Sequence, residues 1–294
     1  MTREYTFFIT DAFTDRSFVG NPSGIVLTKG DMSDNEMQKA ARELNHPETI
    51  CIRKLDRDIY SARYFTPTEE IKISGHAALA TFWTLAKFGY IGSSESKKKV
   101  LQYTGAGPLC VYLSFRGGEV DFVDVQLPEM KVTSAVEDLE ALAEAFEVDA
   151  DHIGTGDVNL IPAVVDGGVE TMIIPLKKAA DLHEVYPKRR NLAMLSEKYH
   201  CKSFHLFYYD EEKKIVEQRN FSPSVSVWEE AGSGTGSGCT YFYMKENGIL
   251  SENRLRARQG QEVGRPSEIE VSEKDGHIFV GGTARIVMEG ILRL

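Results

Sequence analysis

Apolar and polar positions along the chain divide it into two series of elements that follow the same order. In the first series, the Ser33–Glu36 capping box predicts a helix that runs to about Leu44. A strongly apolar helix follows Ser74, and Gly117-Gly118 turns a hairpin. The strands expected in this half, from alternating or apolar stretches, are 6–9, 24–27, 50–53, 59–65, 109–115 and 120–125.

The second half repeats this order of elements. A helix is expected near 191–199, and a second long helix follows Ser233. Between the two series, the segment from Ser134 to Glu137 has the pattern of a capping box and predicts a helix to about Phe146. The strands expected here are 159–165, 171–174, 204–209, 215–221, 268–271, 277–280 and 284–288.

A sequence motif marks the same point in both series. The pattern R-x-F-[ST]-P-[ST] occurs at Arg63–Thr68 and again at Arg219–Ser224. A Ser-Gly pair follows each copy, at Ser74 and at Ser233, and opens a helical stretch of the same length. The Arg-to-Ser spacing is 11 in the first copy and 14 in the second, so the second copy carries three additional residues. This self-similarity indicates an internal duplication.

The duplication predicts an α/β (α+β) fold with two pseudo-symmetric lobes, each a mixed sheet rolled around a central helix. A helix as apolar as 77–88 belongs inside a lobe rather than on its surface. We place the N-terminal lobe at 1–128 and the C-terminal lobe at 129–294, with the last strand free to cross over to the first lobe. A chain of 294 residues also favours two hydrophobic cores over one.

The charge of the chain narrows the range of partners. A net charge of −10 argues against nucleic acid and anionic membranes, since either would need a large basic surface. The basic run Lys97–Lys99 is interpreted as a solvated loop. No stretch approaches the ~18 apolar residues of a membrane-spanning helix, and the chain starts without an apolar leader. We therefore expect a cytoplasmic protein.

The sequence contains no local signature of a metal or a nucleotide cofactor. Its four cysteines form no CxxC pair, and its histidines form no HxxxH or HxxH pair. The glycines of 232–238 alternate strictly, which does not fit G-x-G-x-x-G, and no P-loop lysine follows them. No cofactor and no metal are therefore expected.

The two Ser-Gly helix starts are the candidate anion-binding elements. We expect the active site in the cleft between the lobes, where small-ligand sites are common. Helix N-termini carry unpaired N–H groups and a partial positive charge, so a facing pair would hold a carboxylate or a developing enolate oxygen. The alternative is that these glycines only permit tight turns and close helix–sheet packing.

Glu48 is the candidate proton-transfer residue. It follows a helix, which Pro47 is expected to end, and precedes an apolar strand. The corresponding segment of the second copy, His200–Ser203, has no acid. One carboxylate would then both remove and return a proton, although a glutamate at such a junction is otherwise a solvated surface charge. His76 would bind a substrate oxygen or position Glu48, unless it is a core or capping histidine.

Several motifs occur in order along nearly the whole chain: Asp11–Arg16, Gly20-Asn21-Pro22, Asn45-x-x-Glu48-Thr49, Phe65-Thr66-Pro67, Gly75-His76-Ala77, Gln259-Gly260 and Gly264-Arg265-Pro266. Together they resemble the phenazine-biosynthesis PhzF family. The resemblance implies the fold of diaminopimelate epimerase, with two similar α/β lobes. It also implies that Glu48 is the acid/base glutamate, that His76 and Asn21 contact substrate, and that Gly75 donates a backbone hydrogen bond.

The same resemblance assigns roles in the second lobe. Aligning 229–236 with the family pattern E-D-P-x-T-G-S-A places Glu230 at a catalytic cleft aspartate and Gly234 and Thr235 at an anion-binding turn. The neighbouring Glu229 is then expected to be solvated. Glu230, Ala231 and Thr235 depart from the family residues Asp, Pro and Ser, so the phenazine-pathway substrate is not assigned.

The resulting hypothesis is a cofactor-independent isomerase that moves a proton on a small carboxylate metabolite and forms a homodimer. The alternative is a small-molecule-binding or interaction protein that retains the fold without catalysis. A two-thiol epimerase is disfavoured, because Ser74 and the segment 233–235 stand where the related epimerases carry cysteines, and a serine hydroxyl is too weak an acid for that role.

Overall fold

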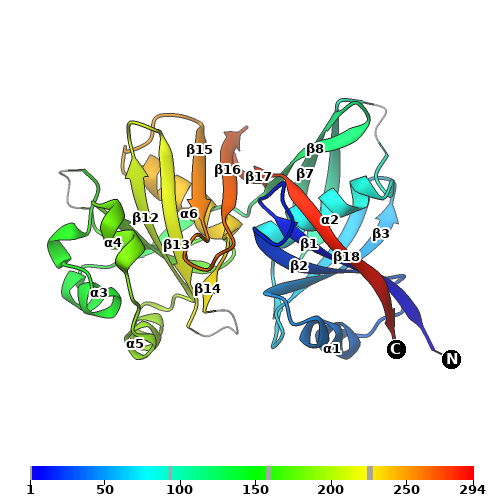
Figure 1. Cartoon of the computed structure of the whole chain (residues 1–294), viewed down its shortest axis with the longest axis horizontal. Coiled ribbons are helices and arrows are strands. Elements are labelled where there is room, and N and C mark those ends of the chain that lie inside the picture. The colour runs from blue at the N-terminus through cyan, green and yellow to red at the C-terminus, as the bar shows by residue number, and fades with distance from the viewer. Residues whose placement is uncertain (1, 93–94, 157–159, 224–227) are drawn as a thin grey trace. The chain divides into compact units, whose positions relative to one another are not determined.

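Each half of the chain folds as a mixed sheet that wraps around one buried helix, α2 (Gly75–Lys87) in the first unit and α6 (Gly234–Glu246) in the second (Figure 1). The computed structural model describes residues 2–92, 95–156, 160–223 and 228–294. Its contacts divide the chain into unit 1, Met1–Pro128 with Phe279–Leu294, and unit 2, Glu129–Ile278. Within the described residues, no helix is long and apolar enough to cross a membrane.

The sheet of unit 1 has the strand order β18-β1-β2-β3-β4-β6-β7-β8-β17, and the two-residue strand β5 pairs with the end of β4. The parallel pairs are β2–β3 and β4–β6. Helix α1 (Asp34–Leu44) lies outside this sheet. The strands are β1 (Glu4–Ala12), β2 (Asn21–Leu27), β3 (Glu48–Asp56), β4 (Ile59–Phe65), β5 (Glu70–Ile71), β6 (Lys97–Thr104), β7 (Gly107–Arg116), β8 (Glu119–Gln126), β17 (His277–Gly282) and β18 (Ala284–Arg293).

Unit 2 repeats this connectivity with the order β9-β10-β11-β12-β13-β15-β16, and the short strand β14 pairs with the end of β13. The parallel pairs are again the corresponding ones, β11–β12 and β13–β15. Its elements are β9 (Lys131–Ala135), α3 (Leu139–Phe146), a 3-10 turn (Ala150–His152), β10 (Ala163–Asp166), β11 (Glu170–Leu176), α4 (Ala179–Glu184), α5 (Arg189–Tyr199), β12 (Ser203–Asp210), β13 (Ile215–Phe221), β14 (Glu229–Glu230), β15 (Arg254–Gln259) and β16 (Ser267–Lys274).

The two arginines of the repeated motif make the same contact in their own units. Arg63 binds Glu70 of β5 through Nε and Nη2 at 2.8 and 2.6 Å. Arg219 binds Glu229 of β14 in the same way at 2.8 and 2.9 Å. Five positions separate Phe65 from its partner Glu70, and eight separate Phe221 from its partner Glu229. The three additional residues of the second copy therefore precede β14.

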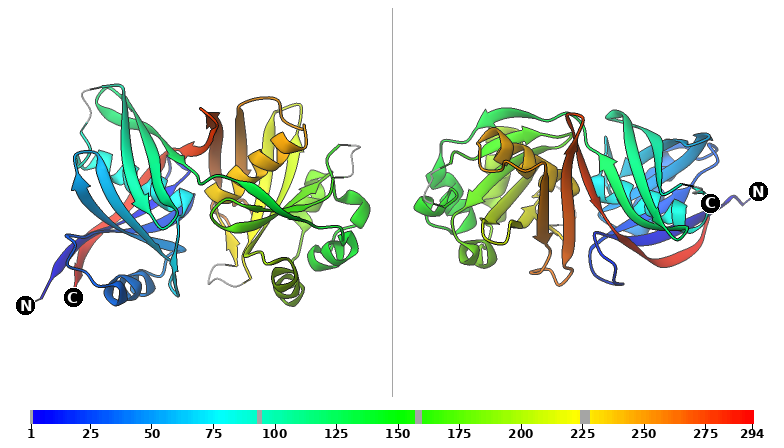
Figure 2. Two further views of the ribbon diagram at one scale, coloured as in Figure 1. Left: turned by 180° about the vertical axis from the view of Figure 1, so that it is seen from behind. Right: turned by 90° about the horizontal axis from the view of Figure 1, so that it is seen from above.

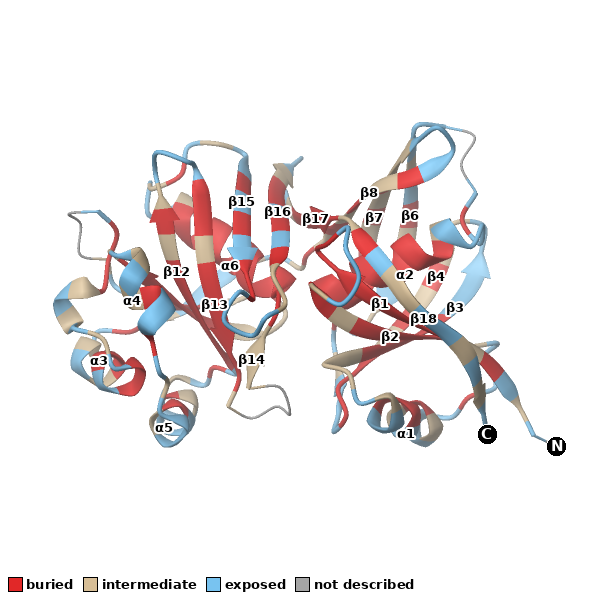
Figure 3. Ribbon diagram, viewed as in Figure 1, coloured by how far each residue is buried: buried red, intermediate tan, exposed pale blue. Residues whose placement is uncertain are grey.

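Both central helices are buried, as the sequence predicts (Figure 3). Every residue of α2 from Gly75 to Leu85 is buried. Phe82 of α2 packs edge-on against Tyr60, with 5.6 Å between the ring centroids. Tyr243 of α6 packs against Phe207 with 6.1 Å between the ring centroids. Figure 2 shows each helix against one face of its own sheet. Each large side chain buried in this way contributes roughly 1.5–3 kcal/mol.

Most of the predicted elements are present, with three corrections. The Ser33–Glu36 capping box of α1 is confirmed. The second predicted box is wrong, because Lys131–Ala135 pairs with β10 as a strand and the cap of α3 is Asp138. The basic run Lys97–Lys99 is not a loop; it begins β6 and pairs with β7. The strand expected at 159–165 begins later than predicted. Its first residue, 159, lies outside the described residues, and β10 begins at Ala163.

Candidate functional site

Glu48 is held at the point where a helix gives way to a buried strand. Helix α1 ends at Leu44, and Asn45 adopts a left-handed conformation (φ 51°, ψ 38°) with its N–H donating to Ala41 O at 3.0 Å. Asn45, rather than Pro47, therefore ends the helix, because asparagine tolerates this backbone region. Glu48 is the first residue of β3 and lies opposite Ser23 of β2 in a parallel pair.

His76 lies in the first turn of α2 and faces Glu48. Its Nε2 is 2.9 Å from Glu48 Oε2, with only 3% of the histidine side chain and 12% of the glutamate side chain exposed. Glu48 is therefore not a solvated surface charge. A carboxylate and an imidazole at this separation, shielded from water, interact far more strongly than the same pair would on the surface.

The other ring nitrogen of His76 is fixed by two polar neighbours. Asn21 Nδ2, from the start of β2, is 3.2 Å from Nδ1, and Ser74 Oγ is 3.3 Å from it. An amide NH₂ can only donate, so Nδ1 accepts and the ring hydrogen is on Nε2, on the side of Glu48. Asn21 therefore orients His76, in addition to any contact with substrate.

The start of α2 contributes backbone donors to the same place. Ser74 is the N-cap, but its side chain makes no capping hydrogen bond. The N–H groups of the first turn, including that of Gly75, consequently have no acceptor within the helix, and the positive end of the helix dipole adds to their attraction for an anion. Unit 1 thus brings together four of the predicted site residues: Asn21, Glu48, Gly75 and His76.

The remaining predicted site residues, Glu230, Gly234 and Thr235, lie in unit 2. Glu230 belongs to β14, and Gly234 and Thr235 open α6. The N-cap Ser233 accepts the N–H of Gly236 through Oγ at 3.2 Å. The N–H groups of Gly234 and Thr235 have no acceptor within the helix, as at any helix start.

The expectation that Glu229 is solvated is wrong. Its side chain is 10% exposed and pairs with Arg219, which is 8% exposed and also donates to Val185 O at 3.0 Å. Glu229 therefore has a structural role: its ion pair with Arg219 joins β14 to β13. Arg219 binds Glu229 rather than Glu230.

Sequence reasoning missed the side chains that brace this turn. Gln259 of β15 accepts the N–H of Ser233 at 3.0 Å and donates to Glu230 O at 2.8 Å. Gly260 has φ +84°, and a Cβ there would lie 2.3 Å from Ala231 O. The Gln259-Gly260 motif was recognised without a role. A polar glutamine at a buried position of an alternating strand was the signal that could have assigned one.

The cysteines are not suited to acid/base chemistry. All four are free. Burial raises the pKa of Cys51, Cys201 and Cys239 to about 12 in each case. A thiol must be ionised to act as a base, so these three are inert at neutral pH. Among the described residues, no group of three or more histidine, cysteine, aspartate or glutamate side chains could hold a metal ion.

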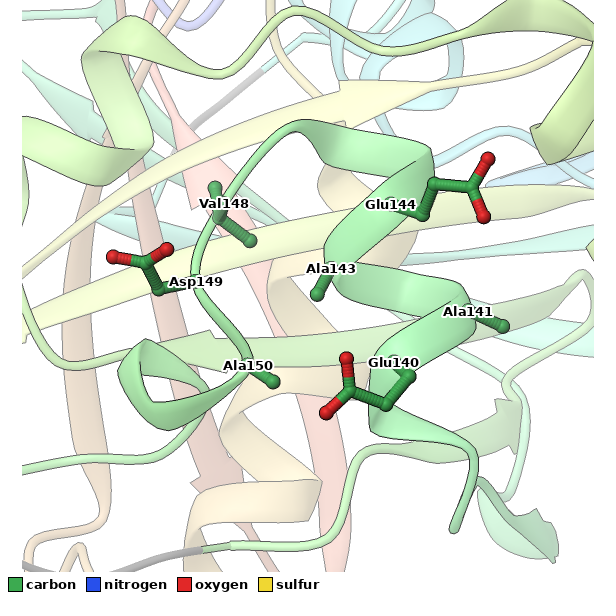
Figure 4. A pocket seen from close by; sticks show the side chains of 7 residues that line it. All are labelled: Glu140, Ala141, Ala143, Glu144, Val148, Asp149 and Ala150. Carbon is green, nitrogen blue, oxygen red and sulfur yellow. The ribbon is translucent and has the colours of Figure 1, made fainter.

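A separate surface hollow of about 580 Å³ lies in unit 2 beside α3 (Figure 4). Its charged lining residues are Glu140, Glu144 and Asp149, and the others are alanines and Val148. Three carboxylates without a basic lining residue would repel an anionic ligand. This hollow does not fit a carboxylate substrate.

Comparison with known proteins gives a consistent result over the full chain. A family model described as "Phenazine biosynthesis-like protein" (PhzC-PhzF) matches residues 10–290. The uncharacterized isomerase YfhB of Bacillus subtilis is 31% identical, with 94% of each chain covered. The trans-2,3-dihydro-3-hydroxyanthranilate isomerase of Pseudomonas chlororaphis is 26% identical over 89% of this chain and 87% of its own.

The solved structures agree. The crystal structure of a PhzF-family phenazine biosynthesis protein from Bacillus anthracis has a TM-score of 0.82 and 26% identity, and the match covers 99% of both chains. The predicted mixed α/β fold is confirmed.

Proposed function

The chain belongs to the PhzC-PhzF family of phenazine biosynthesis-like proteins, and from that premise we propose that it is a cofactor-independent isomerase in which Glu48 moves a proton on a small carboxylate. The observation that carries the proposal is the 2.9 Å approach of His76 Nε2 to Glu48 Oε2, with only 3% of the histidine and 12% of the glutamate side chain exposed. Relatives named as isomerases support the reaction class.

The proposed reaction needs no net change in atoms or electrons. Glu48 accepts a proton from a carbon next to a carbonyl or an unsaturated bond, and the electron pair of the broken C–H bond moves into that system. The protonated Glu48 then returns the proton at another carbon. His76, with its hydrogen on Nε2, faces the Glu48 carboxylate and orients it toward the substrate. The first-turn amides of α2 would stabilise the negative charge that develops.

Residues of unit 2 are proposed to bind the substrate. Gly234 and Thr235 would hold the carboxylate with their N–H groups, and Glu230 would serve as a second polar group next to the reacting atoms. These roles follow from the family resemblance and remain predictions, as does the location of the site in a cleft between lobes.

The test is proton exchange with solvent, which does not require that the substrate be known. An extract of small carboxylate metabolites, with trans-2,3-dihydro-3-hydroxyanthranilate added as one candidate, is incubated with the protein in D₂O. Mass spectrometry should find at least one carboxylate that gains a deuteron with wild type. With Glu48→Gln the rate should fall at least about 1,000-fold, or ~4 kcal/mol, because the amide cannot accept the proton.

Glu43→Gln is the matched control, since Glu43 is an exposed glutamate of α1 and should exchange as wild type does. Equal labelling by wild type and Glu48→Gln would refute the role of Glu48. No labelling by wild type, in the presence of a bound carboxylate, would favour a binding protein without catalysis.

A further inference from the structure

A group of polar side chains lies buried in unit 2 beneath the start of α6. His205 is 0% exposed, Asn220 1% and Gln218 2%, on the adjacent strands β12 and β13. Burying a polar group costs free energy unless hydrogen bonds replace those it makes with water. The contacts of these side chains therefore need an explanation.

Asn220 fixes the state of His205. Its Oδ1 accepts a hydrogen bond from Ser203 Oγ at 2.7 Å and lies 3.0 Å from His205 Nδ1. Because a carbonyl oxygen only accepts, the hydrogen of the ring is on Nδ1. Burial lowers the pKa of His205, although hydrogen bonds with Gln218 and Asn220 oppose the shift. His205 is thus a neutral imidazole with a defined tautomer.

Gln218 continues the network to the helix start. Its Nε2 donates to Ser237 Oγ at 2.5 Å and to Gln259 Oε1 at 3.0 Å. Gln259 in turn holds the N–H of Ser233 and the carbonyl of Glu230. The network therefore makes hydrogen bonds to two places. Gln259 of β15 binds the turn before α6, and Gln218 of β13 binds the first turn of α6.

His205 itself fills the space under the first turn of α6. A Cβ at Gly236 would lie 2.3 Å from His205 Nδ1 and 2.6 Å from Cε1. Position 236 must therefore be glycine while the imidazole is present, and the ring supports the backbone that carries the N–H groups of Gly234 and Thr235.

The first copy builds the same framework with a different set of side chains, in which buried Tyr64 donates to Gln102 Oε1 at 2.5 Å. The strand register aligns Phe65 and its partner Thr49 with Phe221 and its partner Phe204. The matching positions are Ile50 for His205, Ala62 for Gln218 and Tyr64 for Asn220. Asn220 Nδ2 also has no hydrogen-bond partner within the described residues, which is unfavourable for stability. The first copy therefore shows that this framework forms without a histidine and a glutamine at the positions of His205 and Gln218.

We propose that His205 is a positioning residue that, together with Gln218, holds the first turn of α6 in the conformation that binds the substrate carboxylate. This inference rests on the proposed function, because it takes the N–H groups of Gly234 and Thr235 as the carboxylate site. His205 does not touch the substrate; it sets the direction in which those two N–H groups point.

The experiment compares a carboxylate with its amide. The probe is 3-hydroxyanthranilate, the aromatic counterpart of the compound for which the Pseudomonas relative is named, since its ring has no proton for Glu48 to move. Its carboxamide has the same ring without the charge. Wild type should bind the acid at least about tenfold more tightly than the amide, since charge-assisted hydrogen bonds are the stronger ones.

His205→Ile installs the residue that the first copy carries, and it should reduce this preference to about threefold or less. Binding of the amide should stay within about twofold of wild type, because the amide does not make the charge-assisted contact. Thr240→Val is the control: Thr240 is a buried residue of α6 outside the network, and its replacement should leave the preference intact.

Each outcome decides between roles. Equal loss of acid and amide binding in His205→Ile would show a structural role only and overturn the proposal, and so would an unchanged preference. Absence of the preference in wild type would remove the carboxylate site from α6 as well. If His205→Ile does not fold, long-range ¹H–¹⁵N spectra of wild type decide: the ring signals of His205 should shift when the acid binds and not when the amide binds.

None of these outcomes depends on the role of Glu48. Glu48→Gln should lose proton exchange while it keeps the preference for the acid. A failure of the catalytic assignment and a failure of the His205 assignment are therefore separately visible.

Discussion

Asn21 illustrates how a single residue can set the chemistry of another. Its amide donates to His76 Nδ1 and so keeps the ring hydrogen on Nε2, facing Glu48. Asn21→Asp has the same shape but replaces the donor with an acceptor. We expect the hydrogen to move to Nδ1, and proton exchange to fall by about tenfold or more, ~1.4 kcal/mol, because the ring nitrogen that faces Glu48 then presents a lone pair to the carboxylate instead of an N–H.

Nitrogen-15 shifts of the His76 ring report the tautomer directly. Asn35→Asp makes the same chemical change at an exposed position of α1, and it should alter neither the tautomer nor the exchange rate. A ring hydrogen that remains on Nε2 in Asn21→Asp would contradict the assignment.

At this scale the sequence identified the reacting groups and not their partners. Glu48 and His76 were recognised as candidates, and Asn21 was expected only to contact substrate. The sequence does not reveal that the amide of Asn21 contacts the ring of His76, 55 positions away. That contact depends on the pairing of β2 with β3 next to α2. The same reason explains why Gln259 was recognised without its role.

At the scale of elements, the two arginine–glutamate pairs form a matched comparison within one chain. Each arginine binds the short strand that precedes a central helix. Each also lies over a phenylalanine ring, with 5.3 Å from Cζ of Arg63 and 4.9 Å from Cζ of Arg219 to the ring centroid. The pairs differ in exposure: 30% and 43% for Arg63 and Glu70, against 8% and 10% for Arg219 and Glu229.

Arg219→Met should therefore destabilise the protein by roughly 3–5 kcal/mol, since it leaves a buried carboxylate without its partner. Arg63→Met should cost about 1 kcal/mol or less, because water solvates Glu70. Urea unfolding curves measure both values. Equal losses for the two variants would show that burial does not govern these contacts.

The elements that sequence patterns missed are those whose register is not set locally. Arg254–Gln259 alternates exposed and buried positions, a strand pattern that its three arginines concealed. Lys97–Lys99 likewise begins a strand because β7 pairs with it. Ser134 has the local pattern of a helix cap, but its neighbour Ala135 pairs with Ala163. Strand pairing overrides a local signal of about 1 kcal/mol.

At the scale of the whole molecule, the repeated motif was enough to predict two copies of one fold. The last strand was expected to be free to cross over to the first lobe, but the sequence did not show with which strand it would pair. The place that β9 takes next to β10 in unit 2 is taken next to β1 in unit 1 by β18. Glu4 pairs with Arg293, a contact between the two ends of the chain that no local pattern encodes. Unit 1 is therefore discontinuous in sequence, whereas unit 2 is one continuous segment.

This difference predicts how fragments of the chain behave. The fragment 129–278 contains the described strands β9 to β16 and the pairs among them, and it should unfold cooperatively by itself in urea. The fragment 1–128 lacks β18 and β17, so β1 and β8 become unprotected edge strands. We expect it to aggregate or to unfold without a cooperative transition.

Adding the missing segment tests the cause. A synthetic peptide of residues 279–294, or its fusion through a flexible linker, should restore a cooperative transition to the fragment 1–128, because it returns β18 to β1 and most of β17 to β8. A peptide of the same composition in scrambled order should not. Cooperative unfolding of 1–128 alone, at the same urea concentration as the completed unit, would mean that β18 is an accessory to this sheet rather than part of its core.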